Sequence, residues 1–275
     1  MKDVVRLYKE PHPASCSMFA SWPGIGNVSL IAADYLRRKL NAEEIGEIEP
    51  TRFFEPTGII VKDNIVEAPR FPESKFYYWE DAVSGNGLLL FIGEEQPSSK
   101  GYELAQCILD VAQKFKVQRV YSCAAAVARI HHTDELKVWG AATNSELTED
   151  LERLDIVLKG DLHIAGLNGL FLGAAKERGI EGICLLGEVP TYAVQIPNPK
   201  ASLGVLEVLS KMTGIEIDLG ELRDLAVQAE RQMDRLAKQA AAEYIEHFTE
   251  PIWERGEDDQ EEEQEDDEEE DEEED

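Results

Sequence analysis

The feature that most limits the fold of this chain is a repeated order of segments: an apolar run, a glycine turn, then a helical pattern. Strand-like runs that are mostly apolar occupy residues 16–22, 88–93, 117–128 and 182–187, and the run at 88–93 is continuously apolar. A run that is apolar at successive positions is typical of a strand covered on both faces. Strands of this type alternating with helices predict an α/β fold with a mostly parallel central sheet flanked by helices.

Helical periodicity links these runs. Apolar residues recur every three or four positions after Asn27, and the pattern ends in basic Arg37, Arg38 and Lys39, which suit the end of a helix dipole. We expect Asn27 to cap this first helix with its side chain. Further helices are expected at 99–115, from 145, and at 170–178, 200–213 and 219–248. Shorter strands are expected at 45–48, 53–54, 76–79 and 138–143, with a hairpin at 58–68 around Asp63-Asn64.

The composition divides the chain into three expected parts: an α/β domain over 1–215, a long helix over 216–250 that packs on the domain or on a partner, and a disordered acidic tail over 251–275. Of the 19 residues from 257 to 275, 17 are Asp or Glu, so this segment cannot bury apolar surface. Removing those 17 charges from the net charge of −29 leaves −12 for residues 1–256. The tail either contacts a basic partner or only maintains solubility. The charge balance argues against nucleic acid as a partner.

Cysteine usage and the hydropathy pattern indicate the compartment. The four cysteines, at 16, 107, 123 and 184, lie far apart in apolar stretches without metal-ligand spacing, as expected of reduced buried thiols. The first residues carry no long apolar run, so we expect no signal peptide. No stretch reaches about 18 uncharged apolar residues, so we expect no membrane span. We therefore expect a cytoplasmic protein.

Two glycine-punctuated regions are candidate binding segments. The first, after the strand at 16–22, is a turn that either serves tight-turn geometry or binds an anion or a partner at a helix N-terminus. It lacks the third glycine or the Lys-Ser/Thr of nucleotide-binding fingerprints. The second region includes residues that follow the strand at 182–187, where they either form a binding rim or only pack. The candidate rim residues are Pro23, Gly24, Ile25, Gly26, Asn27, Asn168, Gly169, Glu188, Pro190 and Tyr192.

The sequence offers little catalytic chemistry. His131 and His132 each lie three residues before a carboxylate, Asp134 and Glu135 respectively. Neighbours on an extended chain point to opposite sides, so we interpret the two histidines as part of a polar loop and not as metal ligands. The Gly-x-Ser-x-Gly turn of a nucleophilic serine does not occur. We expect no catalytic residue, metal or cofactor.

Several segments, in order over roughly 15–245, resemble the prokaryotic relatives of the proteasome assembly chaperones. These segments are Trp22-Pro23-Gly24-Ile25-Gly26-Asn27-Val28, Gly166-Leu167-Asn168-Gly169-Leu170, Leu185-Leu186-Gly187-Glu188-Val189-Pro190-Thr191-Tyr192 and Pro197-Asn198-Pro199-Lys200-Ala201. The resemblance implies a three-layer α/β/α fold similar to that of purine nucleoside phosphorylases, with homo-oligomers and a chaperone role toward proteasome α subunits. The resemblance implies no catalytic residues. The family has also been labelled ATP-grasp-like, but this sequence lacks a recognisable set of lysine and carboxylate residues for binding metal and phosphate.

The family resemblance leads to two functional hypotheses. The first is a non-enzymatic assembly chaperone or scaffold that binds subunits of a larger complex through the sheet rim, the long helix and the acidic tail. Family members that dock on the proteasome tend to end in hydrophobic-Tyr-X, whereas this sequence ends in Glu273-Glu274-Asp275, so we expect docking without tail insertion. The second is a small-molecule binder or enzyme that holds phosphate, nucleoside or nucleotide near Gly24, Gly26, Asn27, Asn168 and Glu188.

Overall fold

The computed structural model describes residues 4–249, except 57, 155 and 159. The chain divides into two compact units, residues 1–230 and 231–275. The last described helix, α6 (Gly220–Thr249), passes from the first unit into the second and matches the helix expected at 219–248. The expected acidic tail at 251–275 lies outside the described residues.

A mixed eight-stranded sheet forms the centre of the first unit, in the order β1-β3-β6-β7-β2-β8-β10-β9. The strands are β1 (Val5–Leu7), β2 (Ser15–Ser21), β3 (Glu43–Ile48), β6 (Ser74–Glu80), β7 (Asn86–Gly93), β8 (Arg119–Ala128), β9 (Val138–Ala142) and β10 (Glu181–Pro190). The central strands β7, β2, β8 and β10 are mutually parallel, and β3 shares their direction through two antiparallel steps. Five of the eight strands thus point one way, which confirms the mostly parallel sheet. The antiparallel margins, including the whole of β1, were not predicted.

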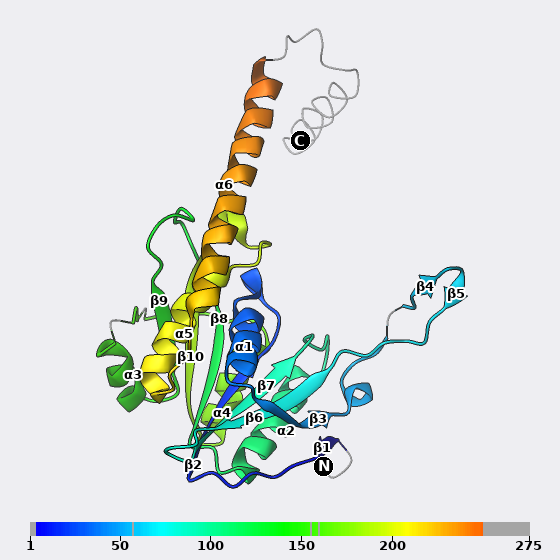
Figure 1. Cartoon of the computed structure of the whole chain (residues 1–275), viewed down its shortest axis with the longest axis vertical. Coiled ribbons are helices and arrows are strands. Elements are labelled where there is room, and N and C mark those ends of the chain that lie inside the picture. The colour runs from blue at the N-terminus through cyan, green and yellow to red at the C-terminus, as the bar shows by residue number, and fades with distance from the viewer. Residues whose placement is uncertain (1–3, 57, 155, 159, 250–275) are drawn as a thin grey trace, which may run out of the picture. The chain divides into compact units, whose positions relative to one another are not determined.

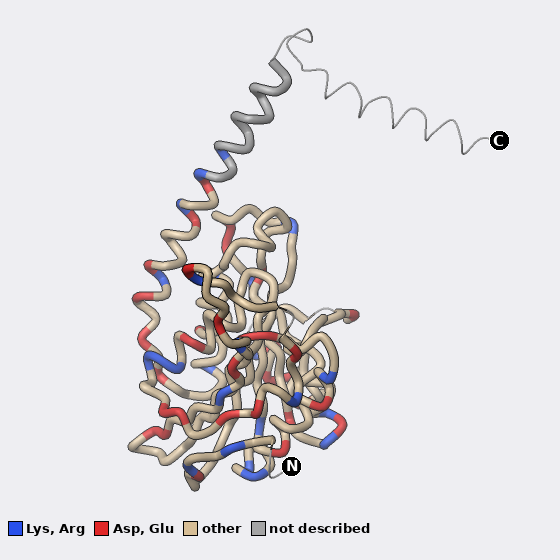
Figure 2. Tube along the Cα trace, turned by 90° about the vertical axis from the view of Figure 1, so that its right-hand side faces the viewer, with Lys and Arg blue, Asp and Glu red and all other residues tan. Residues whose placement is uncertain are grey.

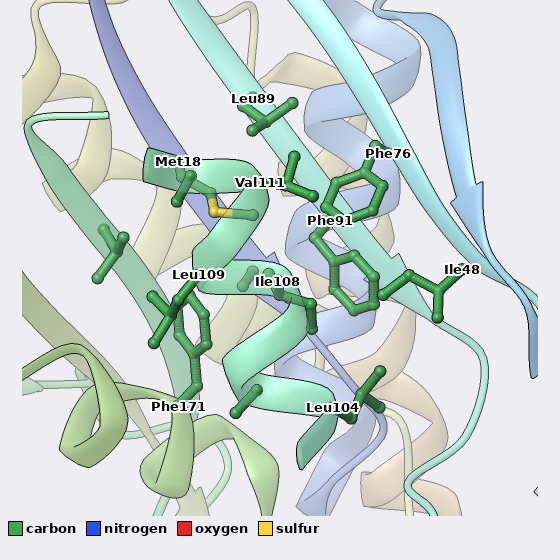
Figure 3. Packing of buried hydrophobic residues seen from close by; sticks show 14 of the residues in the cluster. Met18, Ile48, Phe76, Leu89, Phe91, Leu104, Ile108, Leu109, Val111 and Phe171 are labelled. Carbon is green, nitrogen blue, oxygen red and sulfur yellow. The ribbon is translucent and has the colours of Figure 1, made fainter. Parts of the chain in front are cut away.

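Helices cover both faces of this sheet (Figure 1). On one face lie α1 (Val28–Lys39) and α5 (Pro199–Thr213), which share a core with α3 (Ser145–Glu152) and the beginning of α6. On the other face lie α2 (Gly101–Lys114) and α4 (Leu167–Glu177). Figure 3 shows α2 packed over the sheet, with Ile108 and Val111 near Met18 and Phe91. The three-layer α/β/α architecture is therefore confirmed.

Two short segments of the first unit, the turn at 50–54 and the hairpin at 61–66, can be compared with their predicted structures. The strand expected at 53–54 was wrong: Pro50 begins a 3₁₀ turn over Pro50–Arg52, and the two phenylalanines that follow are buried against the core. Proline fixes its own φ and suits the first position of such a turn. The expected hairpin is confirmed as β4 (Val61–Lys62) and β5 (Ile65–Val66), joined by Asp63 and Asn64 at φ of 50° and 63°. Two successive positive φ values define the type I′ turn that Asx residues favour.

Charged residues of both signs are interspersed along the first unit (Figure 2). Many of them form exposed ion pairs, such as Arg6 with Glu49 at 2.8 Å and Lys39 with Glu221 at 2.9 Å. Such exposed pairs contribute little each to stability. Among the described helices, none combines the length and the apolar character that crossing a bilayer requires.

Candidate functional site: the rim at the carboxyl end of the sheet

The two candidate segments of the sequence meet through Trp22 and Asn168. Asn168 Oδ1 accepts a hydrogen bond from the Trp22 backbone N–H at 3.2 Å, and its Nδ2 donates to the Trp22 carbonyl oxygen at 3.3 Å. Ser29 Oγ lies 3.3 Å from the same Oδ1 as a third partner. Asn168 is buried, and so is the Trp22 indole, which packs against Phe91 and Phe171 at centroid distances of 5.2 and 5.7 Å. The end of β2 is thereby joined to the beginning of α4.

A second bridge between the same segments comes from Gln96, which the sequence analysis did not single out. Its Nε2 donates to the Pro23 carbonyl at 2.6 Å, and its Oε1 accepts from the Leu167 backbone N–H at 2.8 Å. One amide side chain thus connects the loop after β7 with the loop after β2 and the N-terminus of α4. A lone glutamine between strand and helix carries no pattern that would reveal this role.

The turn after β2 also contacts the segment that precedes α5. Gly26 has φ of 60°, which a residue without Cβ adopts readily. Its N–H donates to the Val194 carbonyl at 3.1 Å, and its carbonyl accepts from the Asn198 N–H at 2.7 Å. The predicted cap by Asn27 was wrong: this residue has φ of 49° and no capping side-chain bond, because an N-cap side chain acts from an extended backbone.

Glu188 and Pro190 occupy a different place from the one predicted. β10 continues through Pro190, so neither residue stands on a loop after the strand, and both are buried. Glu188 Oε1 accepts from Trp139 Nε1 at 2.9 Å, and Oε2 accepts from the Lys137 backbone N–H at 3.0 Å. The carboxylate therefore fastens the beginning of β9 to β10. The sequence did not reveal this role for two reasons. An acidic residue after an apolar run suggests a solvated loop, and the partners of Glu188, which are Lys137 and Trp139, lie about 50 residues earlier in the chain.

Tyr192, in the 3₁₀ turn Thr191–Ala193 that follows β10, has a side chain that reaches His132. Its hydroxyl oxygen accepts from the His132 backbone N–H at 2.8 Å and lies 2.8 Å from His132 Nδ1. The interpretation that His131 and His132 point to opposite sides was wrong, since their ring centroids are 4.1 Å apart. The chain turns at His132, and a turn removes the alternation of an extended strand. His132 is buried, whereas 53% of Tyr192 is exposed.

Apolar side chains are exposed around this end of the sheet. Ile25 is 43% exposed, Val127 is 43% exposed and Leu162 is 40% exposed. These three residues line one pocket of about 480 Å³, whose walls also include Ala124, Ala126, Trp139, Ile164 and Leu186. We call Ile25, Val127, Leu162 and Tyr192 the apolar rim. Ile25 and Tyr192 were among the residues predicted from the sequence, whereas Val127 and Leu162 were not. Val127 stands at the end of an apolar strand, where a valine is expected to belong to the core.

Most polar groups near the apolar rim are paired within the protein, whereas the buried Ser21 Oγ and Trp22 Nε1 at the end of β2 have no hydrogen-bond partner among the described residues. The amides of Gly26 and Asn27 donate to the carbonyls of Val194 and Gly24, and Asn168 and Glu188 are satisfied as described. An anion at the turn would have to break these bonds. Across residues 4–249, apart from 57, 155 and 159, no group of three His, Cys, Asp or Glu side chains is arranged to hold a metal ion. The arrangement favours contact with another apolar surface over phosphate binding or acid–base chemistry.

Comparison with known proteins identifies the class. The chain belongs to the PAC2 family, whose model matches residues 18–237. It is 30% identical over 243 residues to the uncharacterized protein MJ1210 of Methanocaldococcus jannaschii, with 86% of this chain and 90% of that protein covered. The resemblance seen in the sequence is thereby confirmed.

Two solved structures from Pyrococcus furiosus are similar in fold and sequence. PbaB, described as an archaeal proteasome activator, has a TM-score of 0.72 and 26% identity, covering 85% of this chain and 98% of PbaB. PbaA, described as an archaeal homolog of proteasome-assembly chaperone, has a TM-score of 0.66 and 26% identity, covering 90% of this chain and 98% of PbaA.

Proposed function

We propose that this protein is a non-enzymatic assembly chaperone or scaffold that binds protein subunits of a larger assembly through the apolar rim. One observation carries the proposal: apolar side chains are exposed at the carboxyl end of the sheet, while the Asn168, Gln96 and Glu188 side chains beneath them are hydrogen-bonded internally. Ligand and partner sites of open α/β sheets commonly lie at this end. Exposed apolar groups above side chains that are bonded within the protein suit a protein interface.

Subunits of a proteasome, in particular α subunits, are the first clients to test. The support is the family membership together with the likeness to PbaB and PbaA, which are described as a proteasome activator and a homolog of an assembly chaperone. Fold alone does not determine function, so the client must be identified by binding. The cytoplasm is the compartment in which we expect this interaction.

In this proposal the three predicted parts have separate roles. The domain over 1–215 presents the apolar rim, the helix over 216–250 extends the contact surface, and the acidic tail at 251–275 attracts basic patches on a client. Electrostatic attraction of this kind mainly raises the association rate and weakens with salt. Deletion of residues 257–275 should therefore slow client association at low salt and have a smaller effect at high salt.

The test is affinity capture of the N-terminally tagged full chain from its native lysate, read by mass spectrometry. A matched bait carries Ile25→Asp and Leu162→Asp, which place charges in the rim at exposed positions. Enrichment of proteasome α subunits by the wild-type bait, and their loss from the rim variant, is the expected result. Equal capture by both baits would remove the rim from the proposal, and capture of neither proteasome nor other assembly subunits would contradict the proposal as a whole.

A further inference from the structure

The β4–β5 hairpin carries a contiguous group of exposed apolar side chains. Five aliphatic side chains on or beside it are more than half exposed: Ile59, Ile60, Val61, Ile65 and Val66. The hairpin pairs only with itself in a two-stranded sheet and projects from the first unit as an arm (Figure 1). A lone two-stranded ribbon is marginally stable in water, and contiguous exposed apolar groups are typical of an interface. We call residues 58–67 the arm.

An apolar groove of complementary character lies between β1 and α2. It has a volume of about 370 Å³, and its lining combines five apolar residues with three charged ones. The apolar residues are the half-buried Val4, Val5, Leu7 and Cys107 and the buried Val111, and the charged residues are Glu10, Asp110 and Lys114. β1 is the edge strand of the large sheet, and within the described residues it pairs with β3 alone. Its outer edge therefore presents backbone groups to which another extended segment can add.

Charge favours a second copy of this chain as the occupant. The arm carries one cation, Lys62, and two anions, Asp63 and Glu67, while the whole chain has a net charge of −29. The three charged residues that line the groove are in ion pairs, with Lys114 Nζ 2.6 Å from Glu10 and Asp110 2.7 Å from Arg178. Two acidic molecules repel each other least where the facing surfaces are apolar and nearly neutral. A basic client, in contrast, would be drawn to the acidic surfaces.

We propose that the arm of one copy binds in the β1–α2 groove of a second copy. Each copy has one arm and one groove, so the contact joins unlike surfaces, and it closes either as a two-fold dimer in which the copies exchange arms or as a larger ring. The strands of the arm would lie along the open edge of β1, and their Ile and Val side chains would fill the groove. This contact is separate from the apolar rim, so self-association and client binding can be tested independently.

The first test is sedimentation velocity of the full chain over a wide concentration range. The arm variant carries Ile60→Ser, Val61→Ser, Ile65→Ser and Val66→Ser, which remove the apolar surface without adding charge. The matched control is Val83→Ser, since Val83 is 95% exposed in a different loop. We expect wild type and Val83→Ser to form one oligomer of defined mass, and the arm variant to be monomeric or to associate at least about tenfold more weakly.

The second test locates the arm on its neighbour by a disulfide. Cys107 lines the groove, whereas the other three cysteines are buried, so we expect Val61→Cys to crosslink to Cys107 of another copy under mild oxidation. The crosslinked species should have twice the monomer mass or more and should vanish when Cys107→Ser is added. Val83→Cys should not crosslink to Cys107.

The proposal is wrong if the wild-type chain stays monomeric throughout, or if the arm variant assembles like wild type. In the second case the arm serves another partner. It is also wrong if the Val61→Cys crosslink persists after Cys107→Ser, because the arms would then meet each other and not the groove. Circular dichroism of each variant establishes that the fold is retained.

Discussion

Asn168 holds both backbone hydrogen-bonding groups of Trp22, one through its side-chain oxygen at 3.2 Å and one through its nitrogen at 3.3 Å. This reciprocal pair replaces the sheet partner that the chain loses where β2 ends. It also fixes the beginning of α4, because Asn168 lies in the first turn of that helix. The shape of the rim above it therefore depends on one buried amide.

Replacing Asn168 should destabilise the protein while an exposed asparagine should be replaceable. Asn168→Ala leaves the Trp22 N–H and C=O buried without these partners, and such a loss costs about 1–3 kcal/mol. Asn86→Ala, at an exposed position, should change the free energy of unfolding by less than about 0.5 kcal/mol. Urea unfolding followed by circular dichroism measures both. Equal stability of the two variants would show that the amide pair contributes little.

Two glycines of α4 should respond to alanine in opposite directions. A Cβ at Gly169 would lie 2.2 Å from the Ile164 carbonyl oxygen, so Gly169→Ala must displace backbone, with a cost of about 1–3 kcal/mol or more. A Cβ at Gly173 meets no atom within 4 Å, and alanine is the better helix former there by up to about 1 kcal/mol. Melting temperatures of both variants test this. A loss of stability in Gly173→Ala would contradict the packing described for α4.

The sequence was most informative where burial is continuous. β2, β7, β8 and β10 are covered on both faces, so their apolar runs identified them. The segments around Trp22 and Asn168, which were selected separately, lie side by side in the structure. β1 was missed because its three residues are only partly buried. Gln96 and Glu188 act through partners about 50 to 75 residues away, and no local pattern encodes such pairs.

Glu188→Gln should weaken the joint between β9 and β10. The carboxylate accepts two N–H groups, from Lys137 and Trp139, whereas an amide offers one acceptor and turns a donor toward the other N–H. Loss of a hydrogen bond to a charged group costs about 1.5–3 kcal/mol. Glu216→Gln, at an exposed position, is the control. Unfolding followed by tryptophan emission should show a lower midpoint for the first variant alone.

The buried thiols should be unreactive in the folded protein. Burial raises the pKa of Cys16 from 9.0 to about 11, and it raises that of Cys184 to about 11 as well. Burial also raises the pKa of Cys107, but this thiol is only half-buried and so remains accessible. Since the thiolate is the reactive species, a thiol reagent at pH 8 should label Cys107 first and the others only on unfolding. Rapid labelling of Cys107→Ser would contradict this order.

The same pKa shifts predict how stability depends on pH. The folded protein keeps the Cys16 proton to a higher pH than the unfolded chain, so this group stabilises the fold below about pH 9, and the contribution is lost as pH rises toward about 11. The free energy of unfolding should therefore fall over that range. It should fall less steeply in Cys16→Ala, although this variant is less stable at pH 7 because of the cavity. Parallel slopes would exclude the thiol as a cause.

The apolar rim should bind clients through contact area and not through charge. Ile25→Asp and Leu162→Asp place carboxylates at positions that are already 43% and 40% exposed, respectively, so the fold should keep most of its stability. An unpaired charge at the centre of an apolar interface typically weakens binding by more than about tenfold. Val83→Asp adds the same charge at a distant exposed site and should bind a client as wild type does. Affinities measured by interferometry at low and high salt separate the effect of contact area from the effect of net charge. If contact area governs binding, each rim variant loses the same affinity relative to wild type at both salt concentrations. A loss confined to low salt, or an equal loss in Val83→Asp, would mean that net charge and not the rim governs binding.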